Sequence, residues 1–191
     1  MTKTPPLTLR LTSEDRKALL SHFLALDAED RRLRFGTPTS DVVVREYVER
    51  LDFVRDGLFV VRDAEGAIAA AAHIAMGGEL AELGLSVAAG HRGRGNGGAL
   101  FARTVDFLRN RGIHEVFVHC LAENQAMRRL ASRHGMRLSS QGTESEGYLT
   151  LPTATAESRF REWLQDQQAA AVEILRRNGQ VARLLWRLYS A

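Results

Sequence analysis

The chain has little cysteine, little lysine and no long apolar run. One residue of 191, Cys120, is a cysteine, so no internal disulfide framework can form. The longest run of small apolar residues, 67–72, has the length of a strand and is far too short to span a membrane. The first residues, Met-Thr-Lys-Thr-Pro-Pro, lack the apolar core of a signal peptide. These absences exclude a disulfide scaffold and predict a protein of the reducing cytoplasm.

The chain also lacks a concentrated charged segment. The net charge is +3, the lysines are Lys3 and Lys17 alone, and the many arginines are dispersed along the chain. A nucleic-acid-binding protein needs a concentrated basic face with aromatic platforms, and neither is visible. The six histidines show no metal-ligand spacing. We therefore expect no nucleic-acid partner and no metal.

The length fits one domain with an appendage, which we place at residues 1–152 and 153–191. The domain begins with an alternating strand and a helix capped by Ser13, and further helices precede a β-hairpin. The apolar and turn patterns predict these elements: a strand over 7–11, helices over 28–35 and from 40 or 41, a hairpin over 58–61 and 67–76, and strands over 79–87, 116–120, 136–139 and 148–151.

The appendage has apolar residues at helical spacing, interrupted at Asn178-Gly179. This pattern predicts one or two amphipathic helices. We favour packing on the domain or on a second subunit, which makes a homodimer through these helices possible. Arginines and Trp186 also suit a membrane surface, but interspersed acids such as Glu162 and Glu173 count against it.

The most informative segment is 85–100, where a strand, a basic glycine loop and a helix start follow one another. Glycines at 93, 95, 97 and 98 let backbone N–H groups converge, and the helix from about 96 adds its unpaired first-turn amides. A phosphate or pyrophosphate fits such a loop.

Two common nucleotide loops do not match this segment. There is no lysine followed by Ser or Thr at the helix start, which argues against a P-loop. The dinucleotide fingerprint fits only loosely, because its third glycine falls one place early and the loop lies in the middle of the chain. The remaining pattern is Arg92-x-x-Gly95-x-Gly97.

This pattern resembles the acetyl-CoA loop of the GNAT acyltransferase superfamily. The segment downstream is similar too: a helix over about 97–110, a strand, Asn124 before a short helix, and a Gly135-Met136 step. The resemblance covers roughly residues 7–152. It implies an α+β fold, in which helices flank a mixed, mostly antiparallel twisted sheet and the C-terminal helical extension is added.

The resemblance also implies how acetyl-CoA would be held. The amides of the loop and the side chains of Arg92 and Arg94 would bind the pyrophosphate, while backbone groups of the splayed strand and Asn124 would meet the pantetheine arm. Arg94 is open to a second interpretation as surface charge, and Asn124 to one as a helix cap. The expected acetyl-CoA residues are Leu85, Val87, Arg92, Gly93, Arg94, Gly95, Asn96, Gly97, Gly98 and Asn124.

Transfer to a primary amine also needs a base, because an alkyl ammonium is protonated at pH 7. Glu82 interrupts an otherwise apolar strand, where an unpaired acid would be expensive. It also matches the strand glutamate used as base in many GNAT enzymes, especially bacterial protein-lysine acetyltransferases. A solvated or arginine-paired Glu82 is the alternative. We expect a protein lysine or a small-molecule amine as acceptor.

One position departs from the family pattern. Many members carry Tyr directly after the position of Leu130, where it protonates the leaving thiolate, and this chain has Ala131. The usual general acid is therefore absent. An enzyme and a catalytically silent acyl-CoA-binding or sensing module both remain open at this point.

Overall fold

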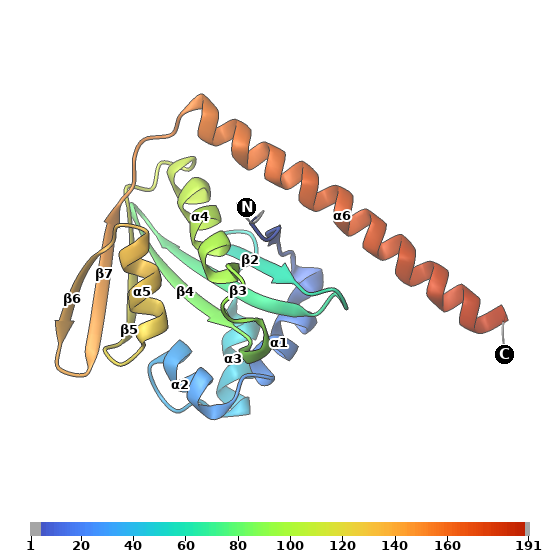
Figure 1. The fold of residues 1–191 in the computed structure, drawn as a ribbon, viewed down its shortest axis with the longest axis horizontal. Coiled ribbons are helices and arrows are strands. Elements are labelled where there is room, and N and C mark those ends of the chain that lie inside the picture. Colours follow the sequence, from blue (N-terminus) through green and yellow to red (C-terminus); the bar gives the residue numbers. More distant parts are fainter. Residues whose placement is uncertain (1–4, 190–191) are drawn as a thin grey trace.

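The computed structural model describes residues 5–189, apart from the side chains of residues 177 and 179–189 (Figure 1). Its elements follow one another in this order: β1 (Leu9–Arg10), η1 (Ser13–Asp15), α1 (Arg16–Leu24), α2 (Ala28–Phe35), α3 (Asp41–Arg50), β2 (Gly57–Arg62), β3 (Ile68–Gly77), β4 (Leu80–Val87), η2 (Ala89–His91), α4 (Asn96–Arg109), β5 (Glu115–Leu121), α5 (Gln125–Arg133), β6 (Arg137–Gln141), β7 (Glu144–Thr150) and α6 (Ala156–Tyr189).

The described strands form one sheet in the order β1-β2-β3-β4-β5-β7-β6. Neighbouring strands are antiparallel except for β4 and β5, which run parallel. That parallel pair extends only from Leu80 opposite Glu115 to Glu82 opposite Phe117. Beyond Glu82 the two strands separate, while β4 stays paired with β3 as far as Val87. The sheet is thus mixed, mostly antiparallel and open at its centre, as the sequence predicts.

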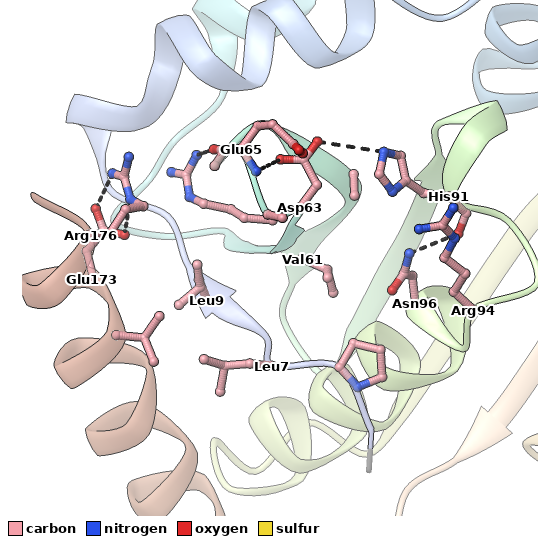
Figure 2. Close-up of a pocket in the computed structure, with 16 residues that line it drawn as sticks. Leu7, Leu9, Val61, Asp63, Glu65, His91, Arg94, Asn96, Glu173 and Arg176 are labelled. Atoms are coloured by element: carbon pink, nitrogen blue, oxygen red, sulfur yellow. Dashed lines mark hydrogen bonds and ion pairs between the residues drawn. The ribbon is translucent and has the colours of Figure 1, made fainter. Parts of the chain in front are cut away.

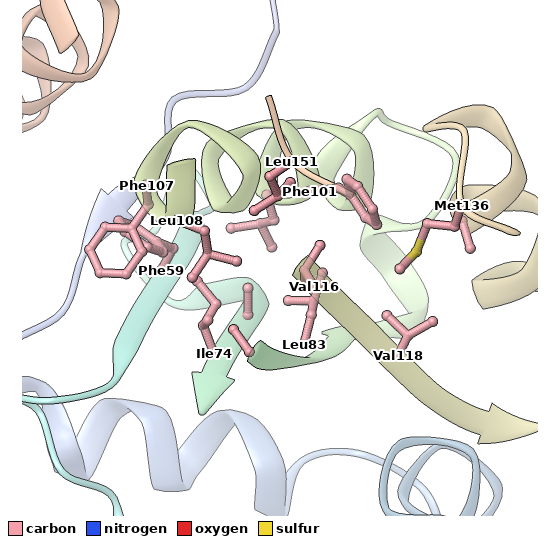
Figure 3. Packing of buried hydrophobic residues seen from close by; sticks show 14 of the residues in the cluster. Phe59, Ile74, Leu83, Phe101, Phe107, Leu108, Val116, Val118, Met136 and Leu151 are labelled. Carbon is pink, nitrogen blue, oxygen red and sulfur yellow. The ribbon is translucent and has the colours of Figure 1, made fainter. Parts of the chain in front are cut away.

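Two hydrophobic clusters cover the two faces of the sheet because side chains alternate along each strand. On one face α4 packs on β2, β3 and β4, and Phe59, Phe101 and Phe107 are fully buried there (Figure 3). On the other face α1 and α3 pack around Phe23 and Val44. α2 contacts β4 and β5 near their separation.

The helix α6 lies beside α4 and β1 and extends along one side of the domain (Figure 1). Its first turns are anchored by polar contacts to α4. Arg103, 2% exposed, donates to Gln165 at 3.0 Å and to the carboxylate of Asp166, and its guanidinium lies over the ring of Phe59. The backbone of α6 is helical through Asn178 and Gly179, so the extension is one continuous helix, the first of the two predicted forms. No helix in the described part of the chain is long and apolar enough to cross a bilayer.

Two local predictions also change. Thr12, not Ser13, is the N-cap of the first helical turn, and the Asp15 carboxylate accepts from the Thr12 backbone N–H at 3.1 Å. At the C-terminal end of the sheet, the predicted polar loop is mostly strand: β6 and β7 pair closely around a turn at Gly142. Polar alternation on an exposed hairpin carries little apolar signal, which explains this miss.

Candidate functional site

Two adjacent cavities lie where β4 separates from β5. We call the larger one the loop cavity; it has a volume of about 620 Å³ and lies between the glycine loop, α2 and α5. We call the smaller one the strand cavity; it has a volume of about 140 Å³ and lies between β4 and β5. Leu33, Arg34, Leu85, Asn124 and Met127 line both.

The glycine loop has the backbone shape that the sequence predicts. Gly93 and Gly95 adopt φ angles of 71° and 87°, a left-handed conformation that a side chain would strain. Gly95 is the N-cap of α4, so the first-turn amides of α4 have no acceptor within the helix. Gly97 and Gly98, in that turn, line the loop cavity. The helix dipole and these amides make this end of the cavity suited to a phosphate group.

The polar side chains of the loop take three different positions. Arg92 lines the loop cavity and forms an ion pair with Asp30 of α2. Asn96 is buried and donates its side-chain amide to the His91 carbonyl at 3.0 Å, so it braces the loop. Arg94 is exposed and lines a different cavity, on the other side of the loop.

That other cavity, the helix cavity, has a volume of about 730 Å³ and lies between α6, β1 and the β2–β3 turn (Figure 2). Most of its charged groups already have partners. His91 lies 3.7 Å from Asp63, and Arg176 is paired with Glu173. Of residues 92–98, Arg94 and Asn96 line it, and none of the four loop glycines does. The helix cavity therefore offers less for a phosphate ligand, although it is larger.

Leu85 and Val87 lie on the part of β4 that β5 does not pair, and both line the loop cavity. Their strand is supported from behind by His22. The His22 Nδ1 atom donates to the Ile68 carbonyl at 2.8 Å, and its Nε2 atom accepts from the Ser86 hydroxyl at 2.8 Å. Burial lowers the pKa of His22, which keeps the ring neutral and suits this pattern of one donor and one acceptor.

Glu82 is the last residue of β4 that pairs with β5. Its side chain is exposed and lines the strand cavity. The expectation of a costly, buried acid is therefore wrong, because alternation turns Glu82 away from the core that Ala81 and Leu83 join. Cys120 also lines this cavity, and burial raises the pKa of its thiol. A raised pKa disfavours the nucleophilic thiolate, so Glu82 is the group better placed for chemistry.

Asn124 caps α5: its side-chain oxygen accepts from Met127 N at 3.0 Å, and its amide donates to the Leu33 carbonyl at 3.3 Å. It also lines both cavities, so capping and ligand contact are compatible. Ala131, where the family pattern has Tyr, is fully buried in the core.

Sequence reasoning missed three arginines around the cavities. Arg129 and Arg133 lie one turn apart on α5 and line the loop cavity, a spacing that could have been read from the sequence. Arg34 lies on α2, and it joins the site only because that helix packs against the separated strands.

Comparisons with known proteins agree with this geometry. The model of the Acetyltransferase (GNAT) family matches residues 23–136. No curated protein sequence matches the chain. The fold is similar to that of the GNAT domain of S. lividans PAT. The TM-score is 0.65, the sequence identity is 21%, and the match covers 75% of this chain and 89% of that one.

Two further solved structures share the fold. A spermidine N-acetyltransferase from Vibrio cholerae, in complex with CoA and spermine, has a TM-score of 0.61, 18% identity, and coverage of 78% of this chain and 96% of that one. A phosphinothricin acetyltransferase from Sinorhizobium meliloti, in complex with AcCoA, has a TM-score of 0.62, 14% identity, and coverage of 80% and 92%. With the family match over most of the domain, the glycine loop and the separated strands, this chain belongs to the GNAT family of acetyltransferases.

Proposed function

We propose that the protein transfers an acetyl group from acetyl-CoA directly to a primary amine, either a protein lysine or a small molecule. The observation that carries this proposal is that the two cavities share lining residues where β4 separates from β5. The loop cavity has phosphate-binding amides at one end, and the strand cavity has a carboxylate, Glu82. Acetyl-CoA would lie in the first cavity, with its thioester at the junction, where the amine reaches it from the second.

In the proposed reaction, an ammonium first loses one proton to Glu82, directly or through water. The neutral nitrogen then attacks the thioester carbonyl carbon, and a free backbone amide near Leu85 stabilises the oxyanion. The C–S bond breaks, the nitrogen loses its second proton, and the CoA thiolate takes a proton from solvent. The products are an amide, CoA and one net proton. A thiolate is a tolerable leaving group without an acid, since a thiol pKa is about 8.5.

The structural neighbours are described as acetyltransferases of different kinds, so they do not identify the acceptor of this protein. Proteins described as PAT, as a spermidine acetyltransferase and as a phosphinothricin acetyltransferase share this fold at 21%, 18% and 14% identity. Identities this low carry the fold and leave the acceptor open, so the acceptor must be argued from this chain's own residues.

Ala131 favours a second candidate, a catalytically silent module that binds acyl-CoA, because the family's usual acid is missing. Two measurements separate the candidates. Acetyl-CoA should raise the melting temperature at micromolar concentration, which both predict. Amine-dependent release of CoA thiol should then exceed the background without amine. Binding without any amine-dependent release would support the silent module, and absence of binding would contradict both.

A further inference from the structure

Arg34 lies where the loop cavity and the strand cavity meet, and it lines both. Its guanidinium lies close to the backbone of Gly84 in the separated part of β4. A Cβ atom at position 84 would come within 2.4 Å of Arg34 Nη2 and 2.5 Å of Arg34 Cζ. The missing side chain at position 84 therefore makes room for the guanidinium beside the place proposed for the thioester.

The charge of Arg34 has no carboxylate partner among the described residues, in contrast to its neighbours on α2. Arg31 forms an ion pair with Asp41 at 2.6 Å, and Arg32 pairs with Glu29 at 2.9 Å. The guanidinium of Arg34 donates one hydrogen bond, from Nη2 to the Tyr47 hydroxyl at 2.8 Å. Its Nε atom is buried and has no acceptor within the described part of the chain.

Arg34 is nevertheless held in place. Tyr47 passes the hydrogen bond on to His73 Nδ1 at 2.8 Å, and His73 Nε2 lies 3.2 Å from the carboxylate of Asp56. Arginine only donates and a carboxylate only accepts, so the chain of donors runs in one direction, from Arg34 to Asp56. Burial lowers the pKa of His73, which keeps the neutral ring that this chain requires.

Aromatic rings surround the same guanidinium. Arg34 Cζ lies 5.7 Å, 5.0 Å and 5.5 Å from the ring centroids of Phe23, Phe35 and Tyr47. These rings attract the cation but also remove water from it. A partly desolvated cation without a counter-ion gains strongly from an anionic ligand, and a guanidinium is suited to carboxylates.

We propose that the acceptor is a small zwitterion of the amino-acid class, whose carboxylate binds Arg34 while its amine is deprotonated by Glu82. This inference rests on the function proposed above and narrows its acceptor. Arg34 and Glu82 line the same cavity without forming an ion pair, so each is available to one end of such a molecule. The cavity volume of about 140 Å³ is well below the roughly 300–1,000 Å³ of pockets for drug-sized ligands, and it suits a compact acceptor.

The test compares each of the L-amino acids with its own carboxamide, which keeps the amine and removes the carboxylate charge. A lysine-containing peptide with blocked ends and spermidine complete the panel, and CoA thiol release is measured for each. At least one free amino acid should react with a kcat/KM about 10- to 100-fold above that of its carboxamide, the worth of a charge-assisted hydrogen bond.

Variants of α2 then test whether Arg34 causes the preference for the free amino acid over its carboxamide. Arg34→Gln should lower kcat/KM for the preferred amino acid to about the level of its carboxamide, mainly through KM, so that the preference for the free carboxylate is lost. Arg34→Lys keeps the charge and should retain part of the preference. Arg32→Gln, on the same helix but outside both cavities, is the matched control and should keep the full preference.

Three results would overturn the inference. They are equal rates for free and amidated acceptors, a preference for the blocked peptide or spermidine, and an unchanged preference in Arg34→Gln. Failure of the broader function looks different: acetyl-CoA binds, but no amine of any kind releases CoA, and this inference then falls with it.

Discussion

The loop cavity and the strand cavity are built by different means. The loop cavity has backbone amides from the glycines and the first turn of α4 at one end, together with arginine side chains such as Arg92. The strand cavity is made of side chains, Glu82 from β4 and Arg34 from α2. Backbone recognition suits a ligand that many proteins share, whereas side chains can change one at a time. We therefore expect substitutions in the strand cavity to change the acceptor and substitutions in the glycine loop to change acetyl-CoA binding.

The largest expected effect separates catalysis from donor binding. Glu82→Gln should lower kcat about 10²- to 10⁴-fold, because it removes the base from the strand cavity. The acetyl-CoA Kd, measured by calorimetry, should stay the same, since Glu82 does not line the loop cavity. Glu79→Gln, an exposed acid just before β4, is the control. Equal loss of kcat in both variants would remove Glu82 from its proposed role.

The next prediction affects the loop cavity alone. Gly95→Val places a β-branched residue at a φ of 87°, which disturbs the N-terminus of α4. Left-handed strain of about 1–2 kcal/mol should weaken acetyl-CoA binding about 5- to 30-fold. Gly90→Ala is the control, because Gly90 has an ordinary φ and open space around it. Unchanged acetyl-CoA affinity in Gly95→Val would argue against the loop as the pyrophosphate site.

A smaller effect tests the strand cavity from its backbone side. Gly84→Ala brings a Cβ atom against Arg34 and should push the guanidinium away from β4. We expect the acceptor KM to rise on the order of 10-fold through loss of a charged contact, with little change in acetyl-CoA Kd. Gly77→Ala, on β3 with its nearest neighbouring atom at 3.8 Å, is the control. Similar acceptor KM values in the two variants would contradict this role of Gly84.

The smallest expected effect is on the pH dependence of stability, and it comes from His22, which supports β4 from behind. Burial lowers the pKa of His22 below its ordinary value of 6.5, so the folded state binds fewer protons than the unfolded state. The free energy of unfolding should therefore fall as the pH drops from about 6.5 towards the lowered pKa, and level off below it. Urea unfolding at several pH values measures this slope.

The variant His22→Gln should make that slope shallower, because it removes one titrating ring, while His73, whose pKa burial also lowers, still contributes. His114→Gln, at an exposed position, is the control and should leave the slope as it is in the unchanged protein. If His22→Gln has the same pH dependence as the unchanged protein, other groups account for the loss of stability in acid.

The sequence by itself determined the sheet, most helix bounds and the glycine loop. These depend on local patterns: apolar runs on either side of a turn in β2 and β3, Gly36 after α2, and glycines at 93 and 95 where φ is positive. The sequence also pointed to Glu82, although the expectation that this acid is buried in an apolar strand was wrong. Neighbouring residues are enough for such predictions because turns, caps and strand faces are set within a few positions.

Only the tertiary structure decided the surroundings of that carboxylate. Arg34 is 48 residues from Glu82 in the sequence. It reaches the strand cavity because α2 packs where β4 and β5 separate. The sequence also left open which side of the loop Arg94 takes and whether α6 continues through Gly179. Such placements depend on contacts between distant segments, which no local pattern records.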